Sequence, residues 1–85
     1  MYKNKYGTRN NIAGINIKQI RKAQVPRMSQ RILAERMQLI GIDLDKNAIQ
    51  RIESGERFVT DIELIGFGKI FGLSIDKLID NSNDC

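Results

Sequence analysis

The chain has 85 residues, the size of one domain, and 41% of them are hydrophobic, which is enough to form a core. It contains no histidine and one cysteine, Cys85, so the composition argues against a disulfide framework, a cysteine-rich zinc site and histidine-based catalysis. No apolar run approaches the roughly 20 residues of a membrane span, and no signal-peptide pattern is present. We therefore expect a cytoplasmic binding protein that is not an enzyme and needs no cofactor, metal or small-molecule ligand.

Charge is divided unevenly along the sequence, whose net charge is +4. Residues 1–57 contain 12 basic and 5 acidic side chains, whereas residues 58–85 contain 2 basic and 5 acidic ones. A basic segment followed by an acidic one is typical of a protein with one surface that faces a polyanion. The alternative interpretation is that these charges are spread over solvated faces.

The first elements are a polar arm and one helix. Residues 1–11 are polar and basic, and we expect them to form a flexible arm. Apolar residues then recur at helical spacing at Ile12, Ile17 and Ile20. Gly14 is expected to weaken the start of this helix, and Pro26 to end the segment.

Two further helices are delimited by capping residues. Ser29 is a good N-cap for a second helix, which Gly41 is expected to end. An extended connector over residues 42–45 follows. Its last residue, Asp45, is the predicted N-cap of a third helix over residues 46–54.

The remaining sequence predicts two helices and a polar tail over residues 81–85. Thr60 and Glu63 have the spacing of a capping box for a fourth helix, and Ser74 is the predicted cap of a short fifth one. The expected core face of the fourth helix is Ile62, Ile65, Phe67 or the stem of Lys69, Ile70 and Phe71. Its glycines, Gly66 and Gly68, either weaken it or allow close packing. Five short helices without a strand pattern predict an all-α domain over residues 12–80.

Three stretches of this sequence are informative because of their order and spacing. They are SQRILAERM at residues 29–37, NAIQRIESGER at residues 47–57 and DIELIGFGKIFGLSIDKLI at residues 61–79. Together they resemble the Cro and lambda-repressor-like (Xre-type) helix-turn-helix family. The resemblance implies a compact five-helix lambda-repressor-like DNA-binding domain, commonly a dimeric transcriptional regulator with its third helix in the major groove. This sequence departs from the family pattern by an extended turn between helices 2 and 3.

The third predicted helix has two faces. Ala48, Ile49 and Ile52 share an apolar face, and the opposite face carries Lys46, Asn47, Gln50 and Arg51. Lys and Arg suit guanine in the major groove, whereas Asn and Gln suit adenine, so we expect these four side chains to read DNA bases. On the wheel alone, an ordinary solvated face remains the alternative.

Other residues are candidates for contacts with the DNA backbone. Ser29 and Gln30 begin a helix, where backbone N–H groups and the dipole favour an anion. We expect the phosphate contacts to come from Ser29, Gln30, Arg27, Arg31 and Arg57. The basic residues of the arm, Lys3, Lys5 and Arg9, are expected to reach an adjacent groove.

Two carboxylate features have structural interpretations. The resemblance implies that Glu53 pairs with Arg21 of the first helix, and we expect that ion pair to be mostly buried. Asp43 and Asp45 could be mistaken for paired catalytic carboxylates, but Asp45 is better explained as a helix cap.

The least basic end of the domain offers a surface for assembly. We expect a homodimer whose seam is formed by Phe71, Leu73, Ile75, Leu78 and Ile79. The alternative is that these side chains complete the core of the monomer. The predicted function is sequence-specific binding of double-stranded DNA by a transcriptional repressor. The alternative function is a protein-interaction module such as the antitoxin of a toxin–antitoxin pair.

Overall fold

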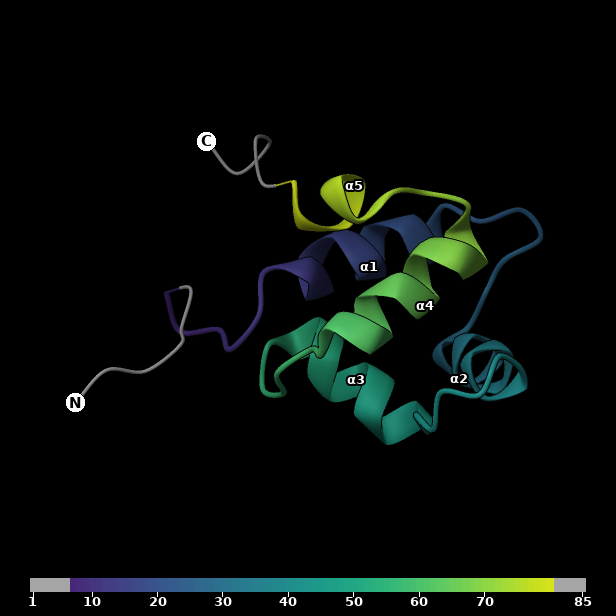
Figure 1. Ribbon diagram of the computed structural model, residues 1–85, viewed down its shortest axis with the longest axis horizontal. Helices are drawn as coiled ribbons and strands as arrows, with labels where there is room; N and C mark the ends of the chain where they lie inside the picture. Colours follow the sequence, from purple (N-terminus) through teal and green to yellow (C-terminus); the bar gives the residue numbers. More distant parts are fainter. Residues whose placement is uncertain (1–6, 81–85) are drawn as a thin grey trace.

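The computed structural model describes residues 7–80 and folds them into five helices without a strand (Figure 1). The helices are α1 (Ala13–Lys22), α2 (Gln30–Leu39), α3 (Lys46–Ser54), α4 (Asp61–Phe71) and α5 (Ile75–Ile79). The all-α prediction is therefore confirmed. Within this part of the chain no helix combines the length and apolarity that crossing a bilayer requires. The predicted tail at residues 81–85 lies outside the described residues.

The helix starts follow the capping residues in the sequence. The Ser29 side chain accepts the N–H of Ile32, and the Asp45 side chain accepts the N–H of Ala48. Thr60 and Glu63 form the complete capping box, as predicted. Ser74 occupies the predicted N-cap position of α5. Its side chain makes no capping hydrogen bond, so the predicted capping contact is absent.

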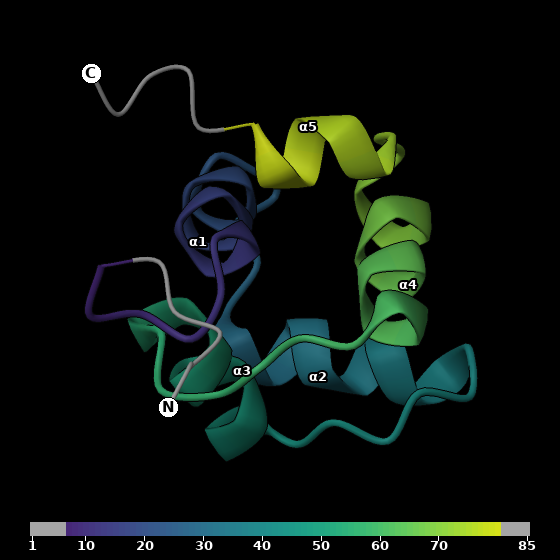
Figure 2. The ribbon, with the colours of Figure 1, turned by 60° about the vertical axis from the view of Figure 1, so that its left-hand side comes forward.

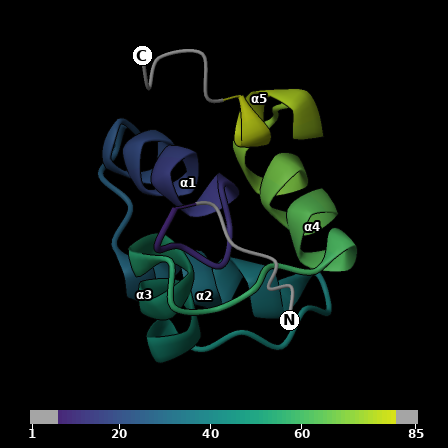
Figure 3. The ribbon, with the colours of Figure 1, turned by 90° about the vertical axis from the view of Figure 1, so that its left-hand side faces the viewer.

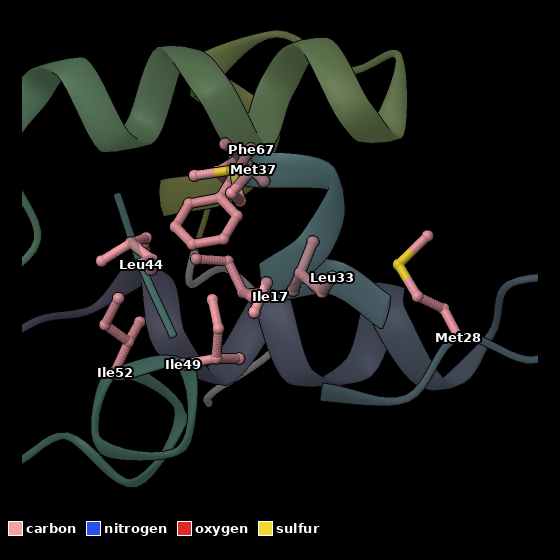
Figure 4. Close-up of a cluster of buried hydrophobic side chains, with 11 residues drawn as sticks. Ile17, Met28, Leu33, Met37, Leu44, Ile49, Ile52 and Phe67 are labelled. Atoms are coloured by element: carbon pink, nitrogen blue, oxygen red, sulfur yellow. The ribbon is translucent and has the colours of Figure 1, made fainter. Parts of the chain in front are cut away.

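The helices surround a single core (Figure 2). α1 packs against α3, α4 and α5, while α2 packs against α3 and α4. Figure 4 shows Phe67 pointing from α4 toward Ile17 of α1, with Ile49 and Ile52 of α3 on the other side of the cluster. These side chains are fully buried. The core therefore fixes the inner face of α3 and leaves its outer face to solvent.

The buried face of α4 differs from the predicted one. Ile62 and Ile65 are 65% and 47% exposed, so their assignment to the core is wrong. The buried residues of this helix are Glu63, Gly66, Phe67 and Gly68. A Cβ at Gly66 would meet the side-chain ends of Ile42 and Met37, and a Cβ at Gly68 would meet the Leu73 carbonyl. Both glycines thus allow close packing, while Ile62 and Ile65 lie on the exposed side of the helix.

The connection between α2 and α3 is pinned to the domain. Gly41 has φ of +88°, and the N–H of Ile42 bonds to the carbonyl of Met37 at 2.9 Å, which closes α2 with a Schellman turn. Leu44 is fully buried, and the Gln38 amide donates to its carbonyl at 2.9 Å. The extended turn is therefore an ordered part of the fold that delivers the chain to Asp45.

One residue of the predicted dimer seam belongs to the core. Leu78 is 0% exposed, so its assignment to an outer seam is wrong. Phe71 is half-buried and stacks on Phe67, with ring centroids 6.5 Å apart. The amide of Asn16 donates to the Leu78 carbonyl at 2.8 Å, which joins α5 to α1. Three seam residues remain partly exposed, at 36–37%: Leu73, Ile75 and Ile79.

Candidate nucleic-acid interface

The outer face of α3 presents the four predicted readout residues to solvent. Lys46, Asn47, Gln50 and Arg51 are all exposed, and no carboxylate interrupts them. We call these four residues the readout face. The helix that carries them is held in place because Asp45 caps its first turn and its opposite side is buried in the core. The hydrogen-bond donors and acceptors of these four side chains are therefore accessible to a ligand such as the base edges in a DNA groove.

A basic hollow adjoins the start of α3. It has a volume of about 600 Å³ and is lined by Arg21, Arg27, Ser29, Gln30, Arg31 and Lys46. Arg21 is paired with the buried Glu53, but Arg27, Arg31 and Lys46 leave the hollow with a positive charge, so it attracts anions. The structure therefore brings four of the five predicted phosphate residues together, at the N-terminus of α2, and joins them to the readout face through Lys46. We call this the basic hollow.

Arg31 remains available within this hollow. Its Nε lies 3.9 Å from Oε2 of Glu35, and both side chains are largely exposed. An exposed pair at that distance contributes little and breaks easily. Arg31 can therefore turn toward an anionic ligand without a large energetic cost.

The predicted ion pair between Arg21 and Glu53 is present and buried. Nε of Arg21 lies 2.7 Å from Oε2 of Glu53, and Nη2 lies 3.0 Å from Oε1. The guanidinium also donates to the Met28 carbonyl at 3.1 Å. The pair thus joins α1, α3 and the segment before α2, and it supports the floor of the basic hollow.

Gln30 takes part in the same network. Its Nε2 donates to Oε1 of Glu53 at 2.9 Å, so its side-chain amide bonds to protein in this structure. Sequence reasoning placed Gln30 correctly at the first position of α2 but missed this contact. The partner is 23 residues away, and nothing in the local sequence indicates it.

Arg57, a predicted phosphate contact, is bonded to protein groups in this structure. Its Nη1 and Nη2 donate to the two carboxylate oxygens of Glu63 at 2.9 and 3.0 Å, and Nη1 also donates to the Phe58 carbonyl. The side-chain hydrogen bond with Glu63 raises the pKa of Arg57. Burial acts to raise the pKa of Glu63, but the hydrogen bonds from Arg57 and Thr60 outweigh it and lower that pKa. These bonds join Arg57 to the first turn of α4.

The basic arm also differs from its prediction where it can be described. Lys3 and Lys5 lie outside the described residues. Arg9 is half-buried and donates to the carbonyls of Ile52 and Glu53 at 3.3 and 2.9 Å. The expectation of a flexible arm is therefore wrong for residues 9–11, which are bonded to the end of α3.

A second hollow, which contains three cationic residues, lies between α1 and the C-terminal end of α3. It has a volume of about 340 Å³ and is lined by Arg9, Ile15, Lys18, Gln19, Lys22 and Glu53. Sequence reasoning did not single out Lys18 and Lys22, although their spacing of four residues places them on one side of a helix. The two hollows extend positive charge along both ends of α3.

Comparisons of the chain with protein-family models, with curated proteins and with solved structures gave no match. The assignment of a function to this interface therefore depends on the geometry and chemistry of its own residues.

Proposed function

We propose that this protein binds double-stranded DNA in a sequence-specific manner and acts as a transcriptional repressor. The observation that carries the proposal is the continuity of two surfaces: the exposed readout face of α3 and the basic hollow at the N-terminus of α2. The first offers groups that discriminate bases, and the second offers cations for the sugar–phosphate backbone.

The docking follows from the dimensions of an α-helix and of B-DNA. α3 enters the major groove, where Lys46 and Arg51 donate to guanine, and Asn47 and Gln50 bond to adenine. The basic hollow then faces the neighbouring strand, where Arg27 and Arg31 contact phosphates and the N-terminus of α2 adds N–H groups. The proposed activity is binding alone, in the cytoplasm, with no cofactor and no catalytic step.

Two copies are proposed to act together. One helix in a groove contacts few base pairs, so pairing about a two-fold axis lengthens the DNA sequence that is recognised. The surface for pairing is the partly exposed set formed by Leu73, Ile75 and Ile79, at the end of the molecule where acidic residues prevail. Pairing there leaves both readout faces free to enter successive major grooves, about 34–36 Å apart.

A second candidate function is a protein-interaction module, such as an antitoxin that binds its toxin. It is favoured by the exposed Ile62 and Ile65 on α4. Ile65 also lines a shallow apolar hollow together with Leu73 and Ile75. In this account the same surface binds a different protein in place of a second copy.

Selection from a random pool of duplexes tests the first proposal. We expect enrichment of one motif, followed by an affinity that falls steeply with salt because cations displace counterions from phosphates. Arg36→Gln removes a charge at an exposed position of α2 that lines neither the basic hollow nor the pairing surface, and as a control it should leave the affinity nearly unchanged. Absence of an enriched motif together with a flat salt dependence would rule out the DNA-binding function.

A further inference from the structure

The segment before α1 lies against the C-terminal end of α3, as Figure 3 shows for the purple part of the chain. The aliphatic stem of Arg9 covers Gly55 so closely that a Cβ built there would be 2.8 Å from Cγ of Arg9. Gly55 itself has φ of +90° and ends α3. The end of the helix and the segment are therefore fitted to one another.

Residues 9–11 also satisfy carbonyl groups that a helix end leaves without partners. Arg9 donates through Nη2 to the carbonyls of Ile52 and Glu53. Its positive charge at this position opposes the negative end of the α3 dipole. Arg9 thus binds the end of α3 through both hydrogen bonds and charge.

Asn11 holds two helices at once. Its Nδ2 donates to the carbonyls of Ile52 and Arg57 at 3.0 and 2.6 Å, while its Oδ1 accepts the N–H of Gly14 at 2.7 Å. The first two bonds hold the end of α3 and the following loop. The third bond caps the start of α1, for which the adjacent Ile12 offers no side-chain oxygen.

Asn10 completes the set. Its backbone N–H donates to the Gly55 carbonyl at 2.8 Å, and its Nδ2 donates to the Glu56 carbonyl at 2.9 Å. Three consecutive residues thus bond to the last turn of α3 and to the loop that follows it. Gln50 and Arg51 of the readout face lie within one turn of the Ile52 and Glu53 carbonyls, to which Arg9 bonds.

We propose that Arg9 and Asn11 are positioning residues that fix the C-terminal end of α3, and with it the angle of the readout face in the DNA groove. The inference rests on the proposed function. The chain entering α3 is held by the buried Leu44 and by the Gln38 amide on its carbonyl, and the core holds the inner face of the helix, so residues 9–11 attach the remaining, C-terminal end. Base discrimination requires side chains to be held within about 0.5 Å and 10–20° of their working geometry.

Arg9 could also act simply as a cation for phosphate, since it lines the hollow with Lys18 and Lys22. Arg9→Lys distinguishes the two roles, because lysine keeps the charge but lacks the Nε that bonds to the Asn11 carbonyl, and its shorter side chain ends before the position from which Nη2 reaches the Ile52 and Glu53 carbonyls. We expect this variant to lose at least about tenfold in its preference for the selected duplex over a scrambled one. The slope of affinity against salt should stay unchanged. Lys18→Arg, an exposed exchange of cations on α1, is the control and should preserve the preference.

Hydrogen exchange provides a readout that needs no DNA. The N–H groups of Gly55, Glu56 and Arg57 bond to carbonyls in the last turn of α3. Their exchange should become at least about tenfold faster in Arg9→Lys, because the turn is released from residues 9–11. If the wild-type protein prefers no duplex, the proposed function fails. If the hydrogen-exchange rates of these three N–H groups are unchanged in Arg9→Lys, the positioning role of Arg9 is overturned.

Asn11→Asp is the second variant. It keeps Oδ1 for the N–H of Gly14, and so preserves the start of α1, but it removes both donors to the end of α3. We expect the same loss of preference as in Arg9→Lys. Arg36→Gln makes the same change of net charge at an exposed position of α2 outside both hollows and is the control. Equal preferences in Asn11→Asp and Arg36→Gln would show that charge alone is responsible and would contradict the proposal.

Discussion

At the scale of single residues, the carboxylate of Glu53 is a buried charge that depends on its hydrogen-bond partners. It is almost completely buried and accepts hydrogen bonds from Arg21 and Gln30. We expect Glu53→Gln to lower the free energy of unfolding by about 3–5 kcal/mol, because the change leaves the Arg21 guanidinium buried without its counter-charge. Urea unfolding measures this loss. Glu35→Gln, at the exposed pair with Arg31, is the control and should cost less than about 1 kcal/mol.

A second expectation at this scale is that DNA binding by Glu53→Gln declines because the protein unfolds. At a temperature where the variant is fully folded, its affinity for DNA should therefore be close to that of the wild type. A large loss of affinity in folded protein would mean that the pair takes part in binding directly.

The pair of Glu63 and Arg57 predicts a dependence of stability on pH. Because hydrogen bonds lower the pKa of Glu63 in the folded state, its charged form contributes stability above the ordinary glutamate pKa of about 4.3. That contribution is lost as the pH falls below this value and passes through the lowered pKa. The wild type should thus lose more stability than Glu63→Gln between about pH 5 and pH 2, as measured by thermal unfolding. Parallel curves for the two proteins would contradict this assignment, and Glu56→Gln, at an exposed glutamate, serves as the control.

The candidate site shows what residue patterns predict and what they miss. The helical wheel placed Lys46, Asn47, Gln50 and Arg51 on the exposed face of α3 because a helix has a fixed period. It could not reveal that Arg9 is bonded to carbonyls more than 40 residues away. A basic residue has the same appearance in a sequence whether its partner is a phosphate or a distant carbonyl.

At the scale of elements, the contact between α1 and α3 makes a prediction about Gly14. Alanine has the higher helix propensity, by about 1 kcal/mol, yet a methyl group here would collide with the Ile52 carbonyl and with Asn11. We expect Gly14→Ala to destabilise the domain by about 1–3 kcal/mol, since overpacking outweighs propensity. The measurement is the free energy of unfolding in urea. Lys18→Ala, at an exposed position of the same helix, should lie within about 0.5 kcal/mol of wild type. A stabilised Gly14→Ala protein would refute the close contact.

The ends of the helices were easier to predict than the direction of their faces. Ser29, Asp45 and Thr60 are caps whose hydrogen bonds are local, so the sequence contains the whole signal. The face of α4 depends instead on which surface approaches a neighbour most closely. α4 packs against its neighbours through Gly66, Phe67 and Gly68, and Ile62 and Ile65 are exposed despite their hydrophobicity.

At the scale of the whole molecule, the proposed dimer depends on apolar side chains that the fold leaves partly exposed. Ile79→Glu should shift the protein from dimer to monomer, because a charge at the seam would have to be buried on pairing. Sedimentation at micromolar concentration measures the change. Leu39→Glu places the same charge on a residue that is 85% exposed at the end of α2, and it should leave the assembly unchanged. A wild-type monomer that binds a half-site as tightly as a palindrome would contradict the dimer.

In the proposed complex the outer face of α3 reads the DNA sequence, while the basic hollow holds the backbone. The affinities of Arg51→Ala and Arg31→Ala for a panel of duplexes with single substitutions in the selected motif test this division of roles. We expect Arg51→Ala to lose about 1–3 kcal/mol at one base position and to become tolerant of substitutions there. Arg31→Ala should weaken binding to every duplex by a similar factor and reduce the salt slope. Identical profiles for the two variants across the panel would contradict the division of roles.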